Sequence, residues 1–339
     1  MTDNREAAGR DGEIQSFRHV LAICDLDDGN DAAMRLAADL AETSGARLTA
    51  LAIRQPASDL ARLAEFAAVS RAEIERRLLA ADRERLLRQV ARNAAGLPVE
   101  TMIRSGKPFL EIIRQVLAGD HDLVIKTAEA PDGLHRFLFS STDQHLLRKC
   151  PCPVWLRLAD ARSPAGTVVA AVDVDEVAAG EPRTQAALNR VIIETAARIA
   201  LFEGAVLRVL HAWEAPGEGL VRQWSDTGRG DDVVRRYLGD VELQHWRALD
   251  RLIASAGAWL GETTRARVAL TPHLVRGAAR TVIPEQTRSL GADILVMGTI
   301  ARTGVPGFII GNTAEDVLNS VDCSVVTVKP PGYVSPVPG

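Results

Sequence analysis

The chain has few of the features that mark nucleic-acid-binding, exported or membrane proteins. Its 40 Lys and Arg residues are outnumbered by 44 Asp and Glu residues, so the formal net charge is -4 and no basic field favours nucleic acid. No apolar run reaches the length of a membrane span, and residues 1–15 lack the apolar core of a secretory signal. We therefore expect a cytoplasmic protein that binds neither nucleic acid nor membrane.

Cysteine is scarce, and its pattern argues against a zinc site. The four cysteines are Cys24, Cys150, Cys152 and Cys323, and none has histidine partners at zinc-ligand spacing. Cys150 and Cys152 form a close pair around Pro151, for which we favour a structural role over a redox role. In a reducing cytosol we expect all four to be free thiols.

The motifs of several common catalytic sites are also missing. The sequence contains no Gly-x4-Gly-Lys-Ser/Thr phosphate loop and no Gly-x-Ser-x-Gly nucleophile elbow. The seven histidines show no paired metal-ligand spacing. No nucleophile lies beside a candidate base, so the sequence provides no mechanism for an enzyme. His211, after a predicted strand, is interpreted as a hydrogen-bonded packing residue, with a place in a binding cleft as the alternative.

The chain does contain an internal repeat. Its 339 residues, 47% of them hydrophobic, are enough for two domains. Four pairs of matching residues share one offset of 171 positions: Gly106 and Gly277, Ile112 and Ile283, Asp122 and Asp293, and Cys152 and Cys323. Upstream the offset falls to 148 for Asp25 and Asp173, so the second copy contains insertions. A constant offset over such a span indicates two copies of one domain.

Each copy alternates short apolar runs with amphipathic segments. The first predicts strands at 20–24, 48–53, 99–103, 123–126 and 154–158, and helices at 31–43, 71–95, 108–117 and 141–149. The second predicts strands at 168–172, 206–212, 267–274, 294–297 and 325–329, and helices at 183–202, 233–260, 281–290 and 312–320. Strict alternation predicts an α/β fold in which each five-stranded parallel sheet has helices on both faces. We place the domains at 16–160 and 166–331, joined by a linker at 159–166.

Candidate ligand-binding residues follow the strands of the second copy. Ligands of such sheets bind beyond the carboxyl ends of the strands, where Asp173 and a glycine-rich loop at 298–311 are expected. Gly298 allows a turn after the strand, and Gly311 allows backbone N–H groups to approach a phosphate. Asn312 or Thr313 can cap the helix that follows. The alternative is that these residues serve only a tight turn and an ordinary helix cap.

This loop resembles that of ATP-binding members of the universal stress protein family, which carry Gly-x2-Gly-x9-Gly-Ser/Thr after the fourth strand. Gly298 and Gly311 match the first and last glycines, and segments 142–154 and 210–214 are similar to the tandem branch of the family. The resemblance covers nearly the whole chain, once per copy. It implies two tandem flavodoxin-like domains, of the adenine nucleotide alpha hydrolase-like kind, packed as an intramolecular pseudo-dimer with further dimerisation open.

The resemblance also implies a function and a site. The function is a stress response in which the second copy binds ATP or a related nucleotide, with Mg²⁺ accompanying it. The residues that match the family's binding positions are Asp173, Met297, Gly298, Ala301, Gly311, Asn312 and Thr313. Two of them depart from the pattern, because Ala301 replaces a glycine and Asn312 replaces a serine or threonine. An asparagine can still donate a hydrogen bond and cap a helix.

The first copy departs further from the family pattern. Thr127 and Ser140 stand in place of Gly298 and Gly311, and Glu129 and Asp132 would repel a phosphate. We therefore expect no ATP binding there, although Asp25 and Ser141 are retained. Two other functions stay open for the whole chain: a scaffold that acts through protein partners, and a slow nucleotide hydrolase.

Overall fold

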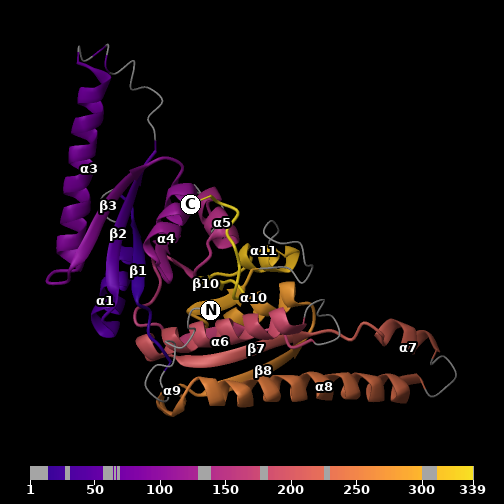
Figure 1. The fold of residues 1–339 in the computed structure, drawn as a ribbon. Coiled ribbons are helices and arrows are strands. Elements are labelled where there is room, and N and C mark those ends of the chain that lie inside the picture. The colour runs from indigo at the N-terminus through magenta and orange to yellow at the C-terminus, as the bar shows by residue number, and fades with distance from the viewer. Residues whose placement is uncertain are drawn as a thin grey trace, which may run out of the picture. The chain divides into compact units, whose positions relative to one another are not determined.

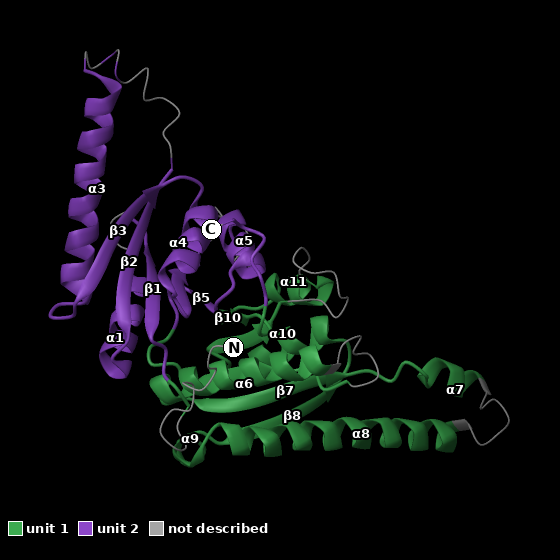
Figure 2. Cartoon of the chain, viewed as in Figure 1, with its two compact units in different colours: residues 1–15, 162–332 green, residues 16–161, 333–339 purple. Residues whose placement is uncertain are grey.

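The computed structural model describes residues 14–26, 31–55, 64, 66, 69–128, 139–175, 182–224, 230–299 and 311–338. The chain forms two compact α/β units (Figure 2). Residues 16–161 and 333–339 make up the N-terminal unit, and residues 1–15 and 162–332 make up the C-terminal unit. Within the described ranges, no helix combines the length and apolar character needed to cross a membrane.

The N-terminal unit contains a parallel sheet in the order β3-β2-β1-β4-β5. Its strands are β1 (His19–Cys24), β2 (Arg47–Arg54), β3 (Val99–Ser105), β4 (Leu123–Thr127) and β5 (Val154–Arg157). Its helices are α1 (Ala32–Ser44), α3 (Arg71–Asn93), α4 (Pro108–Gly119) and α5 (Ser141–Lys149). Every residue of β1 and β4 is buried, as expected for strands covered on both faces.

The C-terminal unit has the equivalent strand order, β10-β9-β6-β7-β8, again parallel. Its strands are β6 (Thr167–Ala171), β7 (Val206–Trp213), β8 (Leu270–Arg276), β9 (Ile294–Gly298) and β10 (Ser324–Val328). Its helices are α6 (Pro182–Glu203), α7 (Glu218–Trp224), α8 (Gly230–Trp259), α9 (Glu262–Arg267), α10 (Ala279–Ser289) and α11 (Asn312–Leu318). The α/β class and the alternation of elements are confirmed.

The strand order explains which helices cover which face. In each unit the second and third strands lie on one side of the first strand, and the fourth and fifth strands lie on its other side. Right-handed crossovers therefore place the two sets of helices on opposite faces. In the N-terminal unit α1 contacts α3 and α4 contacts α5, in agreement with this rule (Figure 1). The point where the order reverses lies between β6 and β9 in the C-terminal unit.

Two details of the C-terminal unit differ from the sequence expectation. Residues 267–274 were expected to form the third strand, but the chain first forms α9 and β8 begins only at Leu270. Gly261, with a φ of +80°, separates α8 from α9 in a backbone conformation that favours glycine. The short helix α7 was not expected, because its seven residues are too few for a clear helical period.

The last residues of the chain complete the N-terminal unit. The Tyr333 hydroxyl donates to the Arg148 carbonyl at 3.1 Å, and the Ser335 hydroxyl donates to the Lys149 carbonyl at 2.8 Å. Both carbonyls belong to the last turn of α5, where a helix leaves its acceptors without intrahelical partners. The tail therefore caps the carboxyl end of α5.

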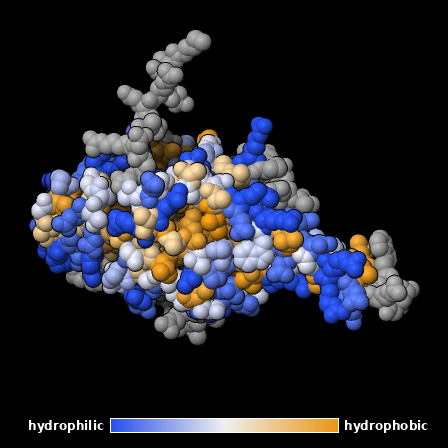
Figure 3. Space-filling model, turned by 90° about the horizontal axis from the view of Figure 1, so that it is seen from below, coloured by the Kyte–Doolittle hydropathy of each residue, from blue (hydrophilic) through white to orange (hydrophobic). Residues whose placement is uncertain are grey.

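Hydrophobic residues on the surface are mixed with hydrophilic ones on the face shown in Figure 3. Large exposed apolar side chains among the described residues include Leu79 and Leu87 on α3 and Leu220 on α7. Single exposed apolar residues of this kind are normal for folded proteins and carry no functional inference.

Candidate functional site

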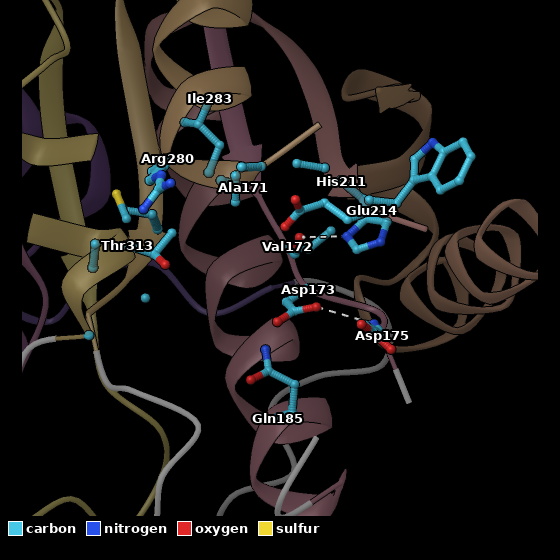
Figure 4. A pocket seen from close by; sticks show the side chains of 18 of the residues that line it. Ala171, Val172, Asp173, Asp175, Gln185, His211, Glu214, Arg280, Ile283 and Thr313 are labelled. Atoms are coloured by element: carbon cyan, nitrogen blue, oxygen red, sulfur yellow. Dashed lines mark hydrogen bonds between the residues drawn. The ribbon is translucent and has the colours of Figure 1, made fainter. Parts of the chain in front are cut away.

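A cavity of about 600 Å³ lies at the carboxyl ends of β6, β7 and β9 in the C-terminal unit (Figure 4). The strand order reverses between β6 and β9, which is where sheets of this kind bind ligands. Six of the seven residues predicted from the sequence line the cavity: Asp173, Met297, Gly298, Gly311, Asn312 and Thr313. The seventh, Ala301, lies outside the described residues. The structure therefore brings together residues that are up to 140 positions apart.

Asp173 is held by a hydrogen-bonded turn at the end of β6. Its backbone N–H donates to Asn189 Oδ1 at 3.1 Å, and Asn189 Nδ2 donates back to the Asp173 carbonyl at 2.7 Å. The Asp173 carboxylate accepts the backbone N–H of Asp175 at 3.2 Å, which fixes the side chain beside the cavity. Asn189 is buried on α6, so this helix fixes the position of the aspartate.

His211 is a hydrogen-bonded packing residue and also lines the cavity, so both interpretations of this residue are correct. Its imidazole is 1% exposed, with Nδ1 3.2 Å from the Val172 carbonyl and Nε2 3.0 Å from Nδ1 of His245 on α8. A carbonyl only accepts, so the hydrogen-bond network assigns the proton to His211 Nδ1 and makes Nε2 the acceptor. Burial lowers the pKa of His211, and nearby Asp173 partly opposes that shift. The imidazole is therefore neutral and joins α8 to the cavity wall.

Gly298 is required by packing between elements. A Cβ at this position would lie 2.7 Å from Cδ2 of Leu188 on α6. The sequence-based explanation was that a glycine lets the chain leave the strand without a Cβ clash, and the structure identifies Leu188 as the residue that a Cβ would meet. Close approach of β9 and α6 leaves no space for a side chain here.

The expected capping roles of Asn312 and Thr313 are wrong. The N-cap of α11 is Gly311, in an extended conformation with φ -62° and ψ 136°, and no side chain caps the helix. Asn312 and Thr313 belong to the first turn and are exposed, with both residues lining the cavity. Their side chains are therefore available to a ligand.

Several cavity residues were missed in the sequence. Arg280, in the first turn of α10, lies beside Thr313, whereas Asp173, Asp175 and Gln185 lie together on another side (Figure 4). Arg280 is exposed and supplies positive charge at the end of the cavity formed by the loop residues. A surface arginine in an amphipathic helix has no signal of its own, but its proximity to the Gly277 turn could have drawn attention to it. The cavity therefore has an acidic side and a basic side.

Comparison with known proteins agrees with the repeat and with the fold. The universal stress protein family model matches residues 16–156 and again residues 167–329. This chain belongs to the universal stress protein family. Universal stress protein E of Escherichia coli K12 is 33% identical over 244 residues, 72% of each chain. Universal stress protein E of Photorhabdus laumondii is 25% identical over 330 residues, 96% of this chain and 98% of the relative.

Solved structures extend the similarity to the tandem universal stress fold. A Pseudomonas aeruginosa PAO1 protein of unknown function superposes with a TM-score of 0.64 and 26% identity, covering 94% of both chains. A universal stress protein from Archaeoglobus fulgidus gives a TM-score of 0.57 at 16% identity, covering 92% of this chain and 98% of that one, which supports the fold alone.

The first universal stress domain fills the matching positions with an ion pair. Lys126 and Asp143 occupy the positions of Met297 and Ala314, which both line the cavity of the second domain. Lys126 Nζ lies 3.0 Å from Asp143 Oδ1 and donates to the Thr127 carbonyl at 3.0 Å. The two side chains are 3% and 0% exposed. Phe109 also stands at the position of Arg280, so this domain lacks that basic residue.

Proposed function

We propose that the protein binds a nucleotide, ATP or a close relative, in its second universal stress domain as part of a stress response. The observation that carries the proposal is the cavity at the topological switch point, which is lined by six residues of the family's binding pattern. Its volume of about 600 Å³ lies in the range of small-molecule sites. The first domain, with its buried ion pair, does not take part in binding.

The charges in the cavity suit the two ends of a nucleotide. Arg280 and the exposed side chains of Asn312 and Thr313 would contact the phosphates, with the guanidinium neutralising negative charge. The Asp173 carboxylate would accept hydrogen bonds from a ribose hydroxyl or an adenine amino group. Among the described residues, no cluster of three His, Cys, Asp or Glu side chains could hold a metal by itself. A Mg²⁺ ion would therefore enter with the phosphates that it bridges.

A ligand screen with matched variants tests this proposal. ATP, ADP, AMP and nucleotide sugars are compared by thermal shift and by calorimetry on the full chain. Asp173→Ala should weaken binding, whereas Asp25→Ala, the matched change in the first domain, should leave it unchanged. Gly311→Trp should abolish binding by filling the cavity. If none of the nucleotides binds the wild-type chain, the scaffold function takes precedence.

A further inference from the structure

A second cavity lies in the N-terminal unit, at the amino ends of the strands of its sheet. It has a volume of about 760 Å³, and its lining includes Arg18, His19, Arg47, His121 and Cys152. These residues stand at or before the amino ends of β1, β2, β4 and β5, whereas the universal stress motif lies at the carboxyl ends. The proposed nucleotide site therefore does not account for this cavity.

Cys152 lines this cavity and contacts a second thiol. Its sulfur lies 3.7 Å from the sulfur of Cys150, and both are free thiols. Cys150 is completely buried at the end of α5, whereas Cys152 is partly exposed. A disulfide has an S–S distance of about 2.05 Å, so oxidation requires the sulfurs to approach by about 1.7 Å. Because only Cys152 is partly exposed, a disulfide in solution would react with Cys152 first. Cys150 would then react with the mixed disulfide formed on Cys152.

Two buried imidazoles form part of the cavity wall. His19 and His121 stack with ring centroids 3.8 Å apart, and both are at least nine-tenths buried. Neither ring nitrogen of His121 makes a well-formed hydrogen bond to the described residues. Burial, assisted by the neighbouring His19, lowers the pKa of His121 to about 4, while the Gln115 carbonyl acts in the opposite direction. At neutral pH the His121 ring is therefore an uncharged polar group that faces the cavity.

The charged residues that line the cavity are two arginines and one aspartate. Arg18 and Arg47 both line the cavity and are both exposed. Asp120 also lines it, and Asp122 lies 3.8 Å from the Arg18 guanidinium. The Asp122 carboxylate accepts the backbone N–H groups of Arg18 and His19, which offset part of its charge. The lining therefore carries one net positive charge, while Asp122, which is paired with Arg18, lies close enough to Cys152 to raise the pKa of its thiol.

The C-terminal unit offers an internal comparison. Cys323 matches Cys152, but Val321 stands where Cys150 would be, so the second universal stress domain has a single thiol. Cys323 is 5% exposed, and burial raises the pKa of its thiol to about 12. The thiol pair therefore belongs to the first domain alone.

The geometry points to a thiol–disulfide exchange site at Cys150 and Cys152 that accepts a small anionic disulfide of the glutathione disulfide class. In the first step the Cys152 thiolate attacks one sulfur of the disulfide, forms a mixed disulfide and releases one thiolate. In the second step the Cys150 thiolate attacks the Cys152 sulfur, forms the Cys150–Cys152 disulfide and releases the second thiolate. The two protons lost by the cysteines are taken up by the two leaving thiolates, so one disulfide is reduced for each one formed.

The state of the thiols sets the speed of this reaction. Contact with the Cys150 thiol and burial raise the pKa of Cys152 well above its usual value. Little thiolate is present at neutral pH, and exchange is slow since the thiolate is the nucleophile. We therefore expect slow oxidation of the thiol pair at neutral pH.

Mass spectrometry of the full chain tests the site directly. The protein is incubated in buffers of increasing ratio of oxidised to reduced glutathione, alkylated and digested with trypsin. Cleavage after Lys149 and Arg157 places both cysteines on one peptide, 150–157. We expect this peptide to lose two hydrogens as the ratio rises. A peptide that stays in the dithiol form in all buffers would overturn the proposal.

Variants separate the two steps and the role of charge. Cys150→Ser should stop the reaction at a glutathione adduct on Cys152, Cys152→Ser should show neither product, and Cys323→Ser should behave as wild type. Arg47→Ala should slow oxidation by glutathione disulfide roughly tenfold but leave the reaction with neutral 2-hydroxyethyl disulfide unchanged. Circular dichroism confirms folding of each variant. An adduct on Cys150 in the Cys152→Ser chain, or equal slowing of both disulfides by Arg47→Ala, would contradict the assignment.

Discussion

Two of the residues that differ between the first and second universal stress domains at the position of the cavity form an ion pair in the first domain. Where the second domain has Met297 and Ala314, the first has Lys126 and Asp143, paired at 3.0 Å and buried. Separating such charges from water is costly, and the cost is offset only while both partners are present. In the first domain, two buried charged side chains that bind each other therefore stand where the second domain has two cavity-lining residues.

Removing only one member of this pair should be far more damaging than removing both. Lys126→Met takes the cation away from a buried carboxylate and should lower the free energy of unfolding by about 3–5 kcal/mol. Adding Asp143→Ala, which reproduces the second domain, should recover most of that loss. Urea denaturation of both chains measures the difference, with Met297→Leu as a control that should change stability by less than about 1.5 kcal/mol. Equal stability of the single and double variants would show that the pair does not matter.

His121 should make the N-terminal unit sensitive to mild acid. Its pKa is lowered from 6.5 to about 4 in the folded chain, mainly by burial. Between these values the unfolded chain binds more protons, so the free energy of unfolding falls as the pH falls, by up to about 3 kcal/mol in total. Stability measured from pH 7 to pH 4 should show this loss, and His121→Asn should reduce the slope. A variant with the wild-type slope would rule out this histidine as the cause.

At the scale of elements, the contact between β9 and α6 determines which residue fits at position 298, beside the cavity. Gly298→Ala should lower the free energy of unfolding by about 1–3 kcal/mol, because the new methyl group meets Leu188. If packing is the reason, the cost should be smaller when Gly298→Ala is introduced into a Leu188→Ala chain, as a double-mutant cycle of thermal unfolding would show. Full additivity of the two changes would contradict the packing explanation.

The sequence predicts elements well where a single physical pattern dominates. The runs around β1 and β4 are apolar without interruption, because both faces of these strands are covered, and they were located within one residue of their ends. The pattern failed between α8 and β8, where Gly261 allows a second helix that the apolar spacing alone does not reveal. The long helix α8 extends over 30 residues, and its contact with the cavity through His245 had no signal in the sequence.

Some residues of the candidate site could be found from the sequence, and others could be identified only in the folded structure. Met297 and the glycines could be found because they follow a family spacing in one chain segment, and Asp173 could be found because it follows the first strand of the second copy. Arg280 and Gln185 enter the cavity from helices whose other exposed residues are ordinary surface residues, so only the folded arrangement identifies them. The roles of Asn312 and Thr313 were misjudged because α11 begins at Asn312, so that its N-cap is the preceding Gly311, which has no side chain to cap the helix.

At the scale of the whole molecule, the end of the chain contributes to the first universal stress domain. Tyr333 and Ser335 donate to the last carbonyls of α5, so deleting residues 333–339 should destabilise the N-terminal unit by about 1–3 kcal/mol. Hydrogen exchange should show faster opening of α5, while β6 and β7 in the C-terminal unit keep their protection. Unchanged exchange in α5 would mean that the tail contributes nothing to its stability.

The two domains share a fold but differ at the carboxyl ends of their strands, where the second has the proposed nucleotide site and the first has a buried ion pair. Isothermal titration of the full chain with ATP and Mg²⁺ tests this difference most directly, because it counts sites. We expect one site per chain, weakened by Asp173→Ala and unchanged by Asp25→Ala. Two sites per chain, or one site that disappears with Asp25→Ala and survives Asp173→Ala, would contradict this expectation.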